Sequence, residues 1–600
     1  MSEESSPQWR RFAKLAPNRK GLKKRARKIE NATLKHAHRF IVRRIDNVRD
    51  VRRHALGWLT LAALLILATG FQMYWSQSKY SQQVVAAGGT YAEGVVGKLD
   101  TLNPLYASTS AERSASHLIF SSLVDYDLKS KVKSDLALTW KPDAEGKVYT
   151  VALRSDAKWH DGEPVTADDV VFTVNLMKNP LARSQQYFDG TWRGISVTKV
   201  DAHTVKFTLP SPYAPFPHAL TFGVLPEHVL RDIAPSRLRE SSFNRAPIGS
   251  GPFKFRNLQV LNADQERLVL HMVANEDYYE GKPLLERFQI HTYQDHDQLR
   301  KGFLTNEVNA ATDLTAGDVD TIKTQVKDVK DASAQLHNGV YGIFRNDSPF
   351  LSDVNVRQAL VQAVDRQAVF KSIGGQGRLL EGPLVPEHTD AIRGMHQAKY
   401  DQKAAEDKLT AAGWVRKGQG VRTKDGQKLQ LTVVSRQDGD YPALLSQLAK
   451  YWRSVGVDVR TQLVPARTIE GNVLIPRAYD VLLYELELGA DPDVYAYWHS
   501  SQARPNARNL ANYKSGIADD ALSSARARSE PQLRDAKYRT FFSQWLQDAP
   551  AIALYQPTLH YIASENTRTI PQNTSIPDAV GRYRAVEYWT VNKTTAYTTP

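Results

Sequence analysis

The sequence KVYTVALRSDAKWHDGEPVTADDVVFTVNLMKNP, at residues 147–180, contains the signals of a strand, a turn and a capped helix in close succession. Apolar and polar residues alternate over residues 148–153, which predicts a half-buried strand. The dipeptide Asp161-Gly162 is typical of a turn. Thr166 then resembles a helix N-cap, because acidic residues follow it in the first turn and apolar residues continue the helix. We therefore expect a sheet whose strands are separated by helices.

The segments that follow repeat this mixture of strands and helices. Residues 203–216 (HTVKFTLPSPYAPF) predict a strand that ends in a proline-rich loop. Residues 247–255 (PIGSGPFKF) predict a glycine turn, with close approach of the backbone, that leads into another strand. Residues 346–370 predict a loop and then a helix with Ser352 or Asp353 as its N-cap. This alternation favours an α/β or α+β fold, and the length allows about two to four domains.

Residues 55–75, ALGWLTLAALLILATGFQMYW, form an uncharged apolar stretch near the start of the chain. At about 1.5 Å per residue this stretch reaches roughly 30 Å, the thickness of the hydrocarbon core of a bilayer. Trp58, Tyr74 and Trp75 lie near its ends, where interfacial aromatic residues are common. We expect a transmembrane helix here rather than a buried helix of a soluble domain.

Charge predicts the orientation of this helix. Residues 1–54 contain 17 Lys and Arg against 5 Asp and Glu, so this tail carries +12 of the net charge of +14. Lys and Arg beside a membrane span stay on the cytoplasmic side. We therefore expect a single-pass protein of the cell membrane, with residues 1–54 cytoplasmic and residues 76–600 extracytoplasmic. A cleaved signal peptide is the alternative, although its charged region is normally much shorter than this tail.

The basic tail has more than one candidate partner. Residues 19–28, RKGLKKRARK, would attract RNA, DNA or anionic lipid alike through their charge, and nothing in them reads bases. Further along, Leu34, Ile41 and Ile45 recur at helical spacing among arginines. We interpret this segment as a basic amphipathic helix on the anionic inner leaflet, and expect no specific nucleic acid. A solvated tail that only sets the topology is the alternative.

The chain contains no cysteine. This excludes disulfides, thiolate metal sites, a cysteine nucleophile and the lipidated cysteine that anchors many exported bacterial proteins. The exported part must then be stabilised by its apolar core, for which a hydrophobic content of 42% is sufficient. The stretch at residues 55–75 is the expected anchor.

Eight sequence blocks occur in the order of a known family. They are TLNP (101–104), SSLVDYD (121–127), KWHDGEPVTADDVVFT (158–173), PYAPF (212–216), PIGSGPFKF (247–255), NEDYYEGKP (275–283), VNVRQALVQAVDR (354–366) and YDVLLYELELGADPDVYAYWHSSQA (479–503). Over residues 90–570 the chain resembles the family 5 extracellular solute-binding proteins, which are the peptide, dipeptide, oligopeptide and nickel binders of ABC importers. The resemblance implies that the chain captures short peptides and delivers them to an ABC importer permease and its ATPases, without a cofactor.

The resemblance also implies a bilobal α/β fold of the type II periplasmic-binding-protein kind, with a ligand cleft between lobes that close by a hinge motion. Residues 76–88 would be a tether between the span and the lobes. Lobe I would comprise residues 89–115, 249–344 and 556–600, with an inserted subdomain at 116–248, and lobe II would comprise 345–555. The hinge strands would lie near residues 341–345 and 554–557.

In this family a buried carboxylate commonly meets the amine of a bound peptide. The usual aspartate position corresponds to Leu488 in this chain, which departs from the well-studied dipeptide and oligopeptide binders. Glu485, Glu487 or Asp491 could supply a substitute carboxylate. Asp491 could equally cap a turn, because a proline follows it. We select Glu487 and Asp491 as ligand-binding candidates.

Five further candidates complete the predicted ligand site. Arg436 follows a predicted strand of lobe II, about where the dipeptide binders place the arginine that meets the peptide carboxylate. A solvated loop arginine is the alternative. Gly94 and Val95 resemble positions whose backbone faces the cleft, although glycine also suits any tight turn. Tyr495 and Trp498 could line a pocket or belong to the core.

The sequence contains no catalytic pattern that we can identify. SxxK occurs at residues 76–79 and 130–133, without the SDN and KTG companions of penicillin-binding enzymes. The motifs GxSxG, HExxH and GxxxxGK[ST] are absent, and no histidine pair at ligand spacing lies beside a carboxylate. We expect no enzyme and no metal site of its own. The alternatives are a binder of a nickel chelate or haem, and a tethered ligand sensor or interaction protein that uses the same cleft.

Overall fold

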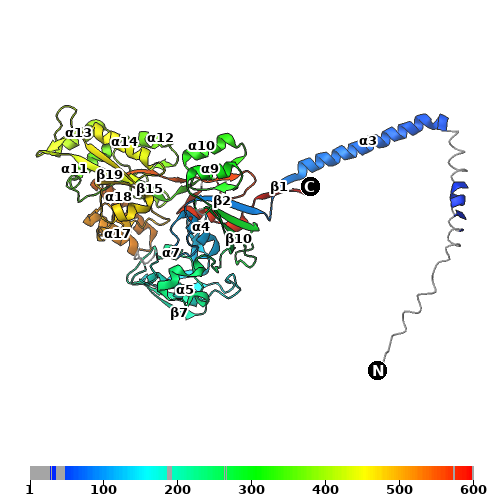
Figure 1. Cartoon of the computed structure of the whole chain (residues 1–600), viewed down its shortest axis with the longest axis horizontal. Coiled ribbons are helices and arrows are strands. Elements are labelled where there is room, and N and C mark those ends of the chain that lie inside the picture. Colours follow the sequence, from blue (N-terminus) through cyan, green and yellow to red (C-terminus); the bar gives the residue numbers. More distant parts are fainter. Residues whose placement is uncertain are drawn as a thin grey trace, which may run out of the picture. The chain divides into compact units, whose positions relative to one another are not determined.

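The computed structural model describes residues 24, 27, 28, 30–35, 48–184, 192–262, 264, 267–571 and 574–597 (Figure 1). The chain divides into two compact units. One comprises Met1–Val84 and Thr594–Pro600, and the other comprises Val85–Lys593. The predicted amphipathic segment around Ile41 and Ile45 lies outside the described residues.

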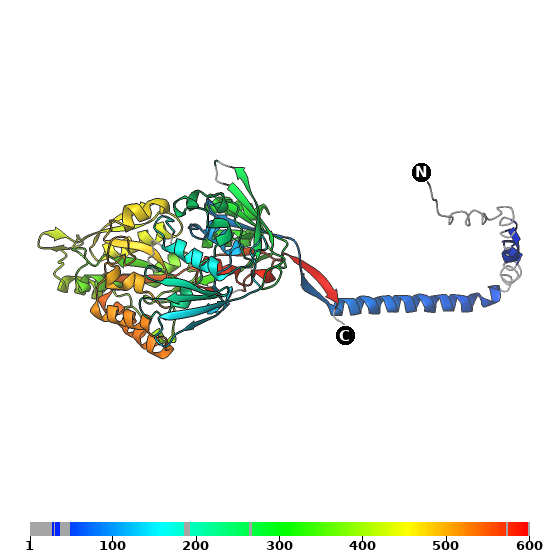
Figure 2. The ribbon, with the colours of Figure 1, turned by 90° about the horizontal axis from the view of Figure 1, so that it is seen from below.

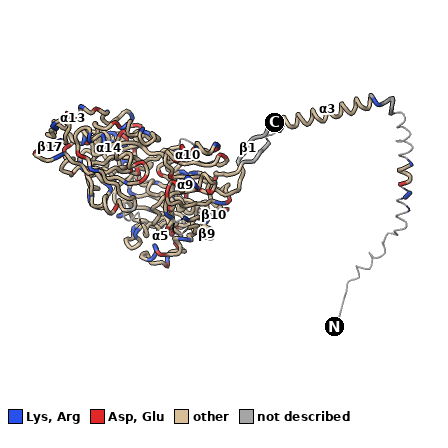
Figure 3. Tube along the Cα trace, turned by 45° about the horizontal axis from the view of Figure 1, so that its top comes forward, with Lys and Arg blue, Asp and Glu red and all other residues tan. Residues whose placement is uncertain are grey.

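The smaller unit contains one long helix, α3 (Val48–Tyr80). Its part His54–Trp75 is long and apolar enough to cross a membrane, with a mean hydropathy of 1.7. The most apolar residues of this part are not buried. In Figure 3 the trace of this part of α3 is tan, without the colours of Lys, Arg, Asp or Glu. The predicted tether is ordered in its first part, because residues 76–80 continue the helix and Ser81–Ala86 forms β1, which pairs with β26 (Asn592–Tyr597).

A seven-stranded sheet forms the first half of the larger unit. Its order is β13 (Val329–Asp331), β24 (Ile562–Ser564), β12 (Ala310–Ala311), β2 (Thr90–Val96), β11 (Arg287–Tyr293), β10 (Arg267–Ala274) and β9 (Phe253–Asn262). β2 is parallel to both β11 and β12, whereas the remaining pairs are antiparallel. In Figure 2 the hairpin of β9 and β10 projects from the body of this unit. We call this sheet, with helices α4 (Ser110–Ile119), α9 (His296–Leu304) and α10 (Ala316–Gln325), lobe I.

A six-stranded sheet forms the second half. Its order is β16 (Arg378–Leu379), β22 (Ala551–Gln556), β15 (Asn338–Phe344), β21 (Val481–Glu487), β19 (Gln430–Arg436) and β20 (Asp458–Val464). β19 is parallel to β20 and β21, and β15 is antiparallel to its two neighbours. We call this sheet and its helices lobe II.

Helices cover both faces of the lobe II sheet, which explains why β15 and β22 are buried along their whole length. Helices α11 (Val354–Gln362), α13 (Gln402–Ala411) and α14 (Tyr441–Ser454) share one core with Val340 and Phe344 of β15. Helices α17 (Gly516–Ala527) and α18 (Pro531–Asp548) share the other core with Tyr341 and Ile343. The two groups lie on opposite sides of β15 in Figure 1.

The inserted subdomain is a four-stranded antiparallel sheet in the order β5 (Ala137–Pro142), β6 (Val148–Leu153), β8 (Thr204–Thr208) and β7 (Ser196–Asp201). The predicted strand at residues 148–153 is β6. Helix α5 (Ala167–Lys178) begins with the predicted cap, since Thr166 and Asp169 form a reciprocal capping box. Gly162 has a φ of 99°, as a tight turn requires. The subdomain shares one apolar core with lobe I.

Three other local predictions are also confirmed. Asp353 caps α11, because its side chain accepts a hydrogen bond from the backbone N–H of Asn355 at 2.8 Å. The glycine turn before β9 requires close backbone approach, because a Cβ at Gly249 would lie 2.0 Å from the carbonyl oxygen of Ile119. The predicted strand at residues 203–216 is β8, which ends at Thr208 before the proline-rich loop.

The chain passes between the two large sheets at two adjacent places, near His337 and Pro557. The first follows β14 (Ala334–Leu336), and the second precedes β23 (Thr558–Leu559), which pairs with β14. The side-chain amide of Gln335 donates to the carbonyl oxygens of Gln556 and Pro557, at 3.0 and 2.8 Å. The predicted hinge residues 341–345 and 554–557 therefore fall largely on β15 and β22. Hinge motion itself stays a prediction.

Candidate functional site

The loops that follow parallel strands of the two lobes meet each other. In lobe I, α4 follows β2 and α9 follows β11; in lobe II, Arg436 ends β19 and Glu487 ends β21. Arg113 of α4 lies 3.3 Å from the carboxylate of Glu487. His296 of α9 interacts electrostatically with Asp438 and Asp440, which follow β19. The carboxyl ends of parallel strands are the usual place for ligands in α/β folds.

We call this region the interlobe junction. From lobe I it includes Ser110, Arg113, His296 and Asp313, and from lobe II it includes Asn338, Arg436, Asp438, Asp440, Tyr441, Glu485 and Glu487. It is rich in charged groups of both signs. Such a set can hold a ligand that carries both an ammonium and a carboxylate.

Glu485 is held by two side chains of lobe II. Asn338 donates to its Oε1 at 2.6 Å, and the hydroxyl of Tyr441 donates to its Oε2 at 3.3 Å. Burial raises the pKa of Glu485, and the hydrogen bond from Asn338 opposes that rise. Glu485 is therefore an ordered and partly desolvated carboxylate at the end of β21.

The predicted candidate Glu487 lies two residues further along β21 and is half exposed. Its carboxylate pairs with Arg113, and the side chains of Glu487 and Arg113 are 57% and 43% exposed. An ion pair with this exposure contributes little to stability, about 0–1 kcal/mol. It nevertheless links the two lobes directly.

Arg436 is not a solvated loop arginine. Its Nε donates to Oδ1 of Asp438 at 3.0 Å, a second bond joins Nη2 to Oδ2, and the guanidinium lies 5.2 Å above the ring of Tyr441. Burial tends to lower the pKa of Arg436, but the bond to Asp438 outweighs it and the pKa lies above its usual value. A role in binding the carboxylate of a peptide stays a prediction.

The predicted candidate Asp491 is occupied by other groups. Arg534 binds it through two nitrogens, with Nη2 to Oδ1 at 2.7 Å and Nη1 to Oδ2 at 3.0 Å. Its Oδ1 also accepts the backbone N–H of Asp493, which is the turn cap considered above. His218 of the inserted subdomain lies 3.6 Å from Oδ2. Leu488, at the usual aspartate position, is buried in the core of lobe II.

The other four predicted residues lie in packed surroundings. Trp498 is 1% exposed and packs edge-on against Trp545 at 5.6 Å. Val95 belongs to the core of lobe I, and a Cβ at Gly94 would lie 2.4 Å from Leu299 of α9. Glycine at this position thus permits helix packing, while contact of the backbone with a ligand stays a prediction. Tyr495 is half-buried and stacks on His499 at 4.0 Å.

The inserted subdomain also contacts lobe II. The hydroxyl of Tyr213 and the Nε of Arg526 both donate to Oδ2 of Asp493, at 3.1 and 3.0 Å. The backbone N–H of Ala214 donates to the carbonyl of Arg526 at 2.8 Å. The guanidinium of Arg526 lies between the rings of Tyr213 and Tyr495, at 4.6 and 4.3 Å from their centroids.

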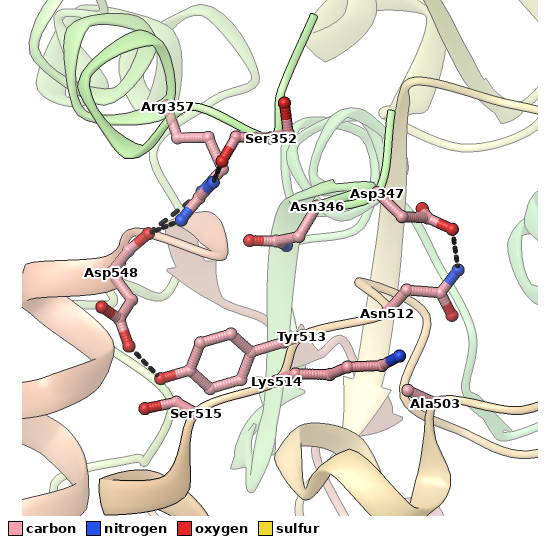
Figure 4. Close-up of a pocket in the computed structure, with 10 residues that line it drawn as sticks. All are labelled: Asn346, Asp347, Ser352, Arg357, Ala503, Asn512, Tyr513, Lys514, Ser515 and Asp548. Carbon is pink, nitrogen blue, oxygen red and sulfur yellow. Dashed lines mark hydrogen bonds between the residues drawn. The ribbon is translucent and has the colours of Figure 1, made fainter. Parts of the chain in front are cut away.

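A cavity of about 400 Å³ lies at the other end of β15, within lobe II (Figure 4). The guanidinium of Arg357 at its wall is fully engaged with backbone carbonyls, among them those of Leu351 and Asp548. The hydroxyl of Tyr513 donates to the carboxylate of Asp548 at 2.6 Å. None of the predicted ligand-binding residues lines this cavity. Its lining residues are Asn346, Asp347, Ser352, Arg357, Ala503, Asn512, Tyr513, Lys514, Ser515 and Asp548.

Comparison with known sequences identifies the family. The sequence model described as bacterial extracellular solute-binding proteins, family 5 Middle, matches residues 131–545. The chain belongs to family 5 of these proteins. The resemblance inferred from the eight sequence blocks is thereby confirmed, as is the bilobal type II fold.

Individual relatives of this family 5 protein cover most of its length. Oligopeptide-binding protein AppA of Bacillus subtilis is 29% identical over 549 residues, which is 86% of this chain and 96% of AppA. The structure of AppA in complex with a nonapeptide has a TM-score of 0.71 at 26% identity, and covers 85% of this chain and 100% of that chain. NikZ from Campylobacter jejuni, solved with Ni(L-His), has a TM-score of 0.70 at 28% identity and covers 84% and 99%. These relatives are solute-binding proteins and not enzymes, which supports a non-enzymatic role at the level of the family.

In this family 5 protein the structure brings only part of the predicted site together. Arg436 and Glu487 lie at the interlobe junction, whereas Asp491 and Tyr495 lie where the inserted subdomain meets lobe II. The contact of Tyr213 with Asp493 was not predicted. Tyr213 belongs to the PYAPF block and Asp493 to the block at residues 479–503, but neither block shows that the two residues meet.

Proposed function

We propose that this chain captures short peptides at the interlobe junction and delivers them to an ABC importer permease and its ATPases. The observation that carries this proposal is the meeting of charged loops from parallel strands of both lobes, Arg113 with Glu487 and His296 with Asp438. A short peptide presents an ammonium at one end and a carboxylate at the other. The junction contains partners for both, namely carboxylates such as Glu485 and the guanidinium of Arg436.

The relatives support a peptide as the ligand. AppA is described as an oligopeptide-binding protein and was solved with a nonapeptide. In the proposed mechanism a peptide enters between the lobes, closure buries it, and the closed form docks on the permease. The direct contacts between the lobes are the bonds that such closure would form.

We further propose that helix α3 spans the membrane and anchors the protein. The span His54–Trp75 and the basic residues before it support a cytoplasmic N-terminus and an extracytoplasmic larger unit. Anchoring would raise the concentration of the receptor near its permease. The tail would lie on anionic lipid of the inner leaflet. The apolar helix of a signal sequence can also be this long and this apolar. N-terminal sequencing of the mature protein is therefore the test: a start near Gly88 would refute the anchor.

Native mass spectrometry of the full chain in detergent tests the ligand. We expect peptides to co-purify with the protein, or to bind from a synthetic mixture of short peptides at micromolar concentration. Absence of any bound peptide under both conditions would contradict the proposed function.

A nickel chelate is the second candidate ligand. His337 and His388 both donate a ring N–H to the carbonyl of Gly489, at 3.0 and 2.8 Å, and NikZ was solved with Ni(L-His). Among the described residues no group of three or more metal-binding side chains is found, so nickel would have to arrive already chelated. Adding nickel with histidine to the same experiment decides between the candidates.

A further inference from the structure

Three buried polar atoms at the carboxyl edge of the lobe I sheet have no hydrogen-bond partner among the described residues. They are Oγ of Ser110, Nδ1 of His296 and Oδ2 of Asp313. His296 begins α9, which closely follows β11, and Asp313 closely follows β12, whereas Ser110 begins α4, the helix that comes after β2. Buried polar atoms are nearly always paired, and exceptions in native proteins commonly mark a functional site.

Asp313 has an unusual backbone conformation. Its φ is 57°, in the left-handed region that few residues other than glycine adopt. Such strain is retained where the surrounding structure enforces it, and it is common at ligand sites. The surroundings do enforce it, because the N–H of the preceding residue, Thr312, donates to the carbonyl of Gly94 at 3.1 Å. Helix α10 then begins with its own capping box of Thr315 and Asp318. The carboxylate of Asp313 therefore has no capping role.

The cation that affects Asp313 most already has a partner. Burial raises the pKa of Asp313, and the charge of Arg582 lowers it. Arg582, however, binds the carboxylate of Glu93 through Nη2 at 2.6 Å and Nε at 3.2 Å, and neither side chain of that pair is exposed. Asp313 is thus a buried carboxylate without a cation of its own, which is unfavourable until one arrives.

The facing loop of lobe II adds further negative charge. His296 interacts electrostatically with Asp313 in its own lobe and with Asp438 and Asp440 in lobe II. The one arginine of this loop, Arg436, is bound to Asp438. The junction around His296 therefore has an excess of carboxylates, which favours a cationic group of a ligand.

We propose that Asp313 of lobe I receives the ammonium group of the peptide, in place of a carboxylate at the position of Leu488 in lobe II. This rests on the proposed function. The other candidates already have partners: Glu487 is paired with Arg113, Asp491 with Arg534, and Glu485 with Asn338 and Tyr441. Ser110 lies beside Asp313 and lowers the pKa of its carboxyl, so the hydroxyl oxygen of Ser110 is placed to accept a second N–H of the same ammonium group.

The test compares peptides with and without a free amine. The full chain in detergent is titrated with a synthetic mixture of short peptides and with the same mixture N-acetylated, and binding is measured by native mass spectrometry. We expect the wild type to bind the free-amine mixture about tenfold more tightly, equivalent to about 1.4 kcal/mol. In Asp313→Asn this preference disappears, because affinity for the free-amine peptides falls while affinity for the acetylated peptides does not.

Two further variants serve as a second test and as a control. Asp313→Gly removes the carboxylate and also relieves the left-handed backbone, so it should fold at least as well and lose the same preference. Asp320→Asn, an exposed position in α10, should keep it. A preference that survives in Asp313→Asn and Asp313→Gly overturns the inference, as does its loss in Glu487→Gln alone. A wild type that binds both mixtures equally overturns only this inference, whereas one that binds no peptide overturns the proposed function as well.

Discussion

The hydroxyl of Tyr213 in the inserted subdomain donates a hydrogen bond to the carboxylate of Asp493 in lobe II, with the two oxygens 3.1 Å apart. These residues are 280 positions apart in the sequence and belong to different parts of the bilobal unit. The same carboxylate oxygen of Asp493 also accepts a hydrogen bond from Arg526. The inserted subdomain therefore takes part in holding the lobes together.

Tyr213→Phe should weaken the closed form. A hydrogen bond to a charged acceptor contributes about 1.5–3 kcal/mol, so peptide affinity should fall by roughly tenfold or more. Small-angle X-ray scattering should show a larger radius of gyration for the variant at the same peptide concentration. Tyr588→Phe is the matched control, because Tyr588 is 54% exposed. Equal affinity and radius in wild type and Tyr213→Phe would show that this contact does not favour closure.

Arg582→Met should destabilise lobe I strongly. The variant leaves Glu93 buried without its cation, and breaking such a pair costs about 3–5 kcal/mol of the free energy of unfolding. Urea denaturation followed by tryptophan fluorescence measures the loss. Arg393→Met removes a pair with Asp390 whose side chains are 79% and 86% exposed, and should cost little. A similar loss in both variants would refute the importance of burial.

Gly249→Ala should impair folding far more than an ordinary glycine substitution. The added Cβ would lie 2.0 Å from the backbone oxygen of Ile119, and a backbone atom cannot move aside as the end of a side chain can. We expect a loss of several kcal/mol or a failure to fold, measured as melting temperature and soluble yield. Gly471→Ala is the control, since nothing lies within 4 Å of its added Cβ. A normal melting temperature for Gly249→Ala would contradict the described packing.

Acidification should destabilise the protein partly through His337. Its ring bridges the carbonyl of Gly489 in lobe II and the hydroxyl of Ser575, at 3.0 and 2.9 Å. Burial, with a smaller contribution from the charge of His388, lowers the pKa of His337 from 6.5 to about 4. The unfolded chain therefore binds the proton more readily than the folded chain. Its contribution is fully present above pH 6.5 and is lost as the pH falls from 6.5 toward 4, by about 3 kcal/mol at most.

The His337→Gln variant isolates this effect. Its free energy of unfolding should depend less on pH between 6.5 and 4 than that of the wild type, as measured by urea denaturation at a series of pH values. His203→Gln, a substitution at the half-buried end of β7–β8, should keep the slope of the wild type. An unchanged slope in His337→Gln would assign the acid sensitivity to other groups.

Local features were the part of the fold that the sequence predicted best. The strand at residues 148–153, the cap at Thr166 and the cap at Asp353 each depend on side chains within a few residues of one another. Their signals are therefore complete within a short window. The family resemblance supplied the bilobal arrangement, which no local signal contains.

Long-range pairings were the part that the sequence could not predict. Asp491 was chosen as a ligand carboxylate, but nothing near it in the sequence shows that Arg534, 43 residues later, binds it through two nitrogens. Nor does any local pattern show that Asp313, after a strand of two residues, would be buried without a partner. A sequence does not show which charged side chains have an ion-pair partner. That depends on the fold.

The pairing of Glu93 with Arg582 has a consequence for the order in which the protein matures. The two residues are separated by 489 positions, so β2 cannot reach its final surroundings until nearly the whole chain has been synthesised. Lobe II, by contrast, is one continuous segment and can fold as soon as its last strand leaves the ribosome or the export channel. During synthesis and export, lobe II should therefore fold while β2 of lobe I is still unpaired. In this interval the chain most needs a chaperone.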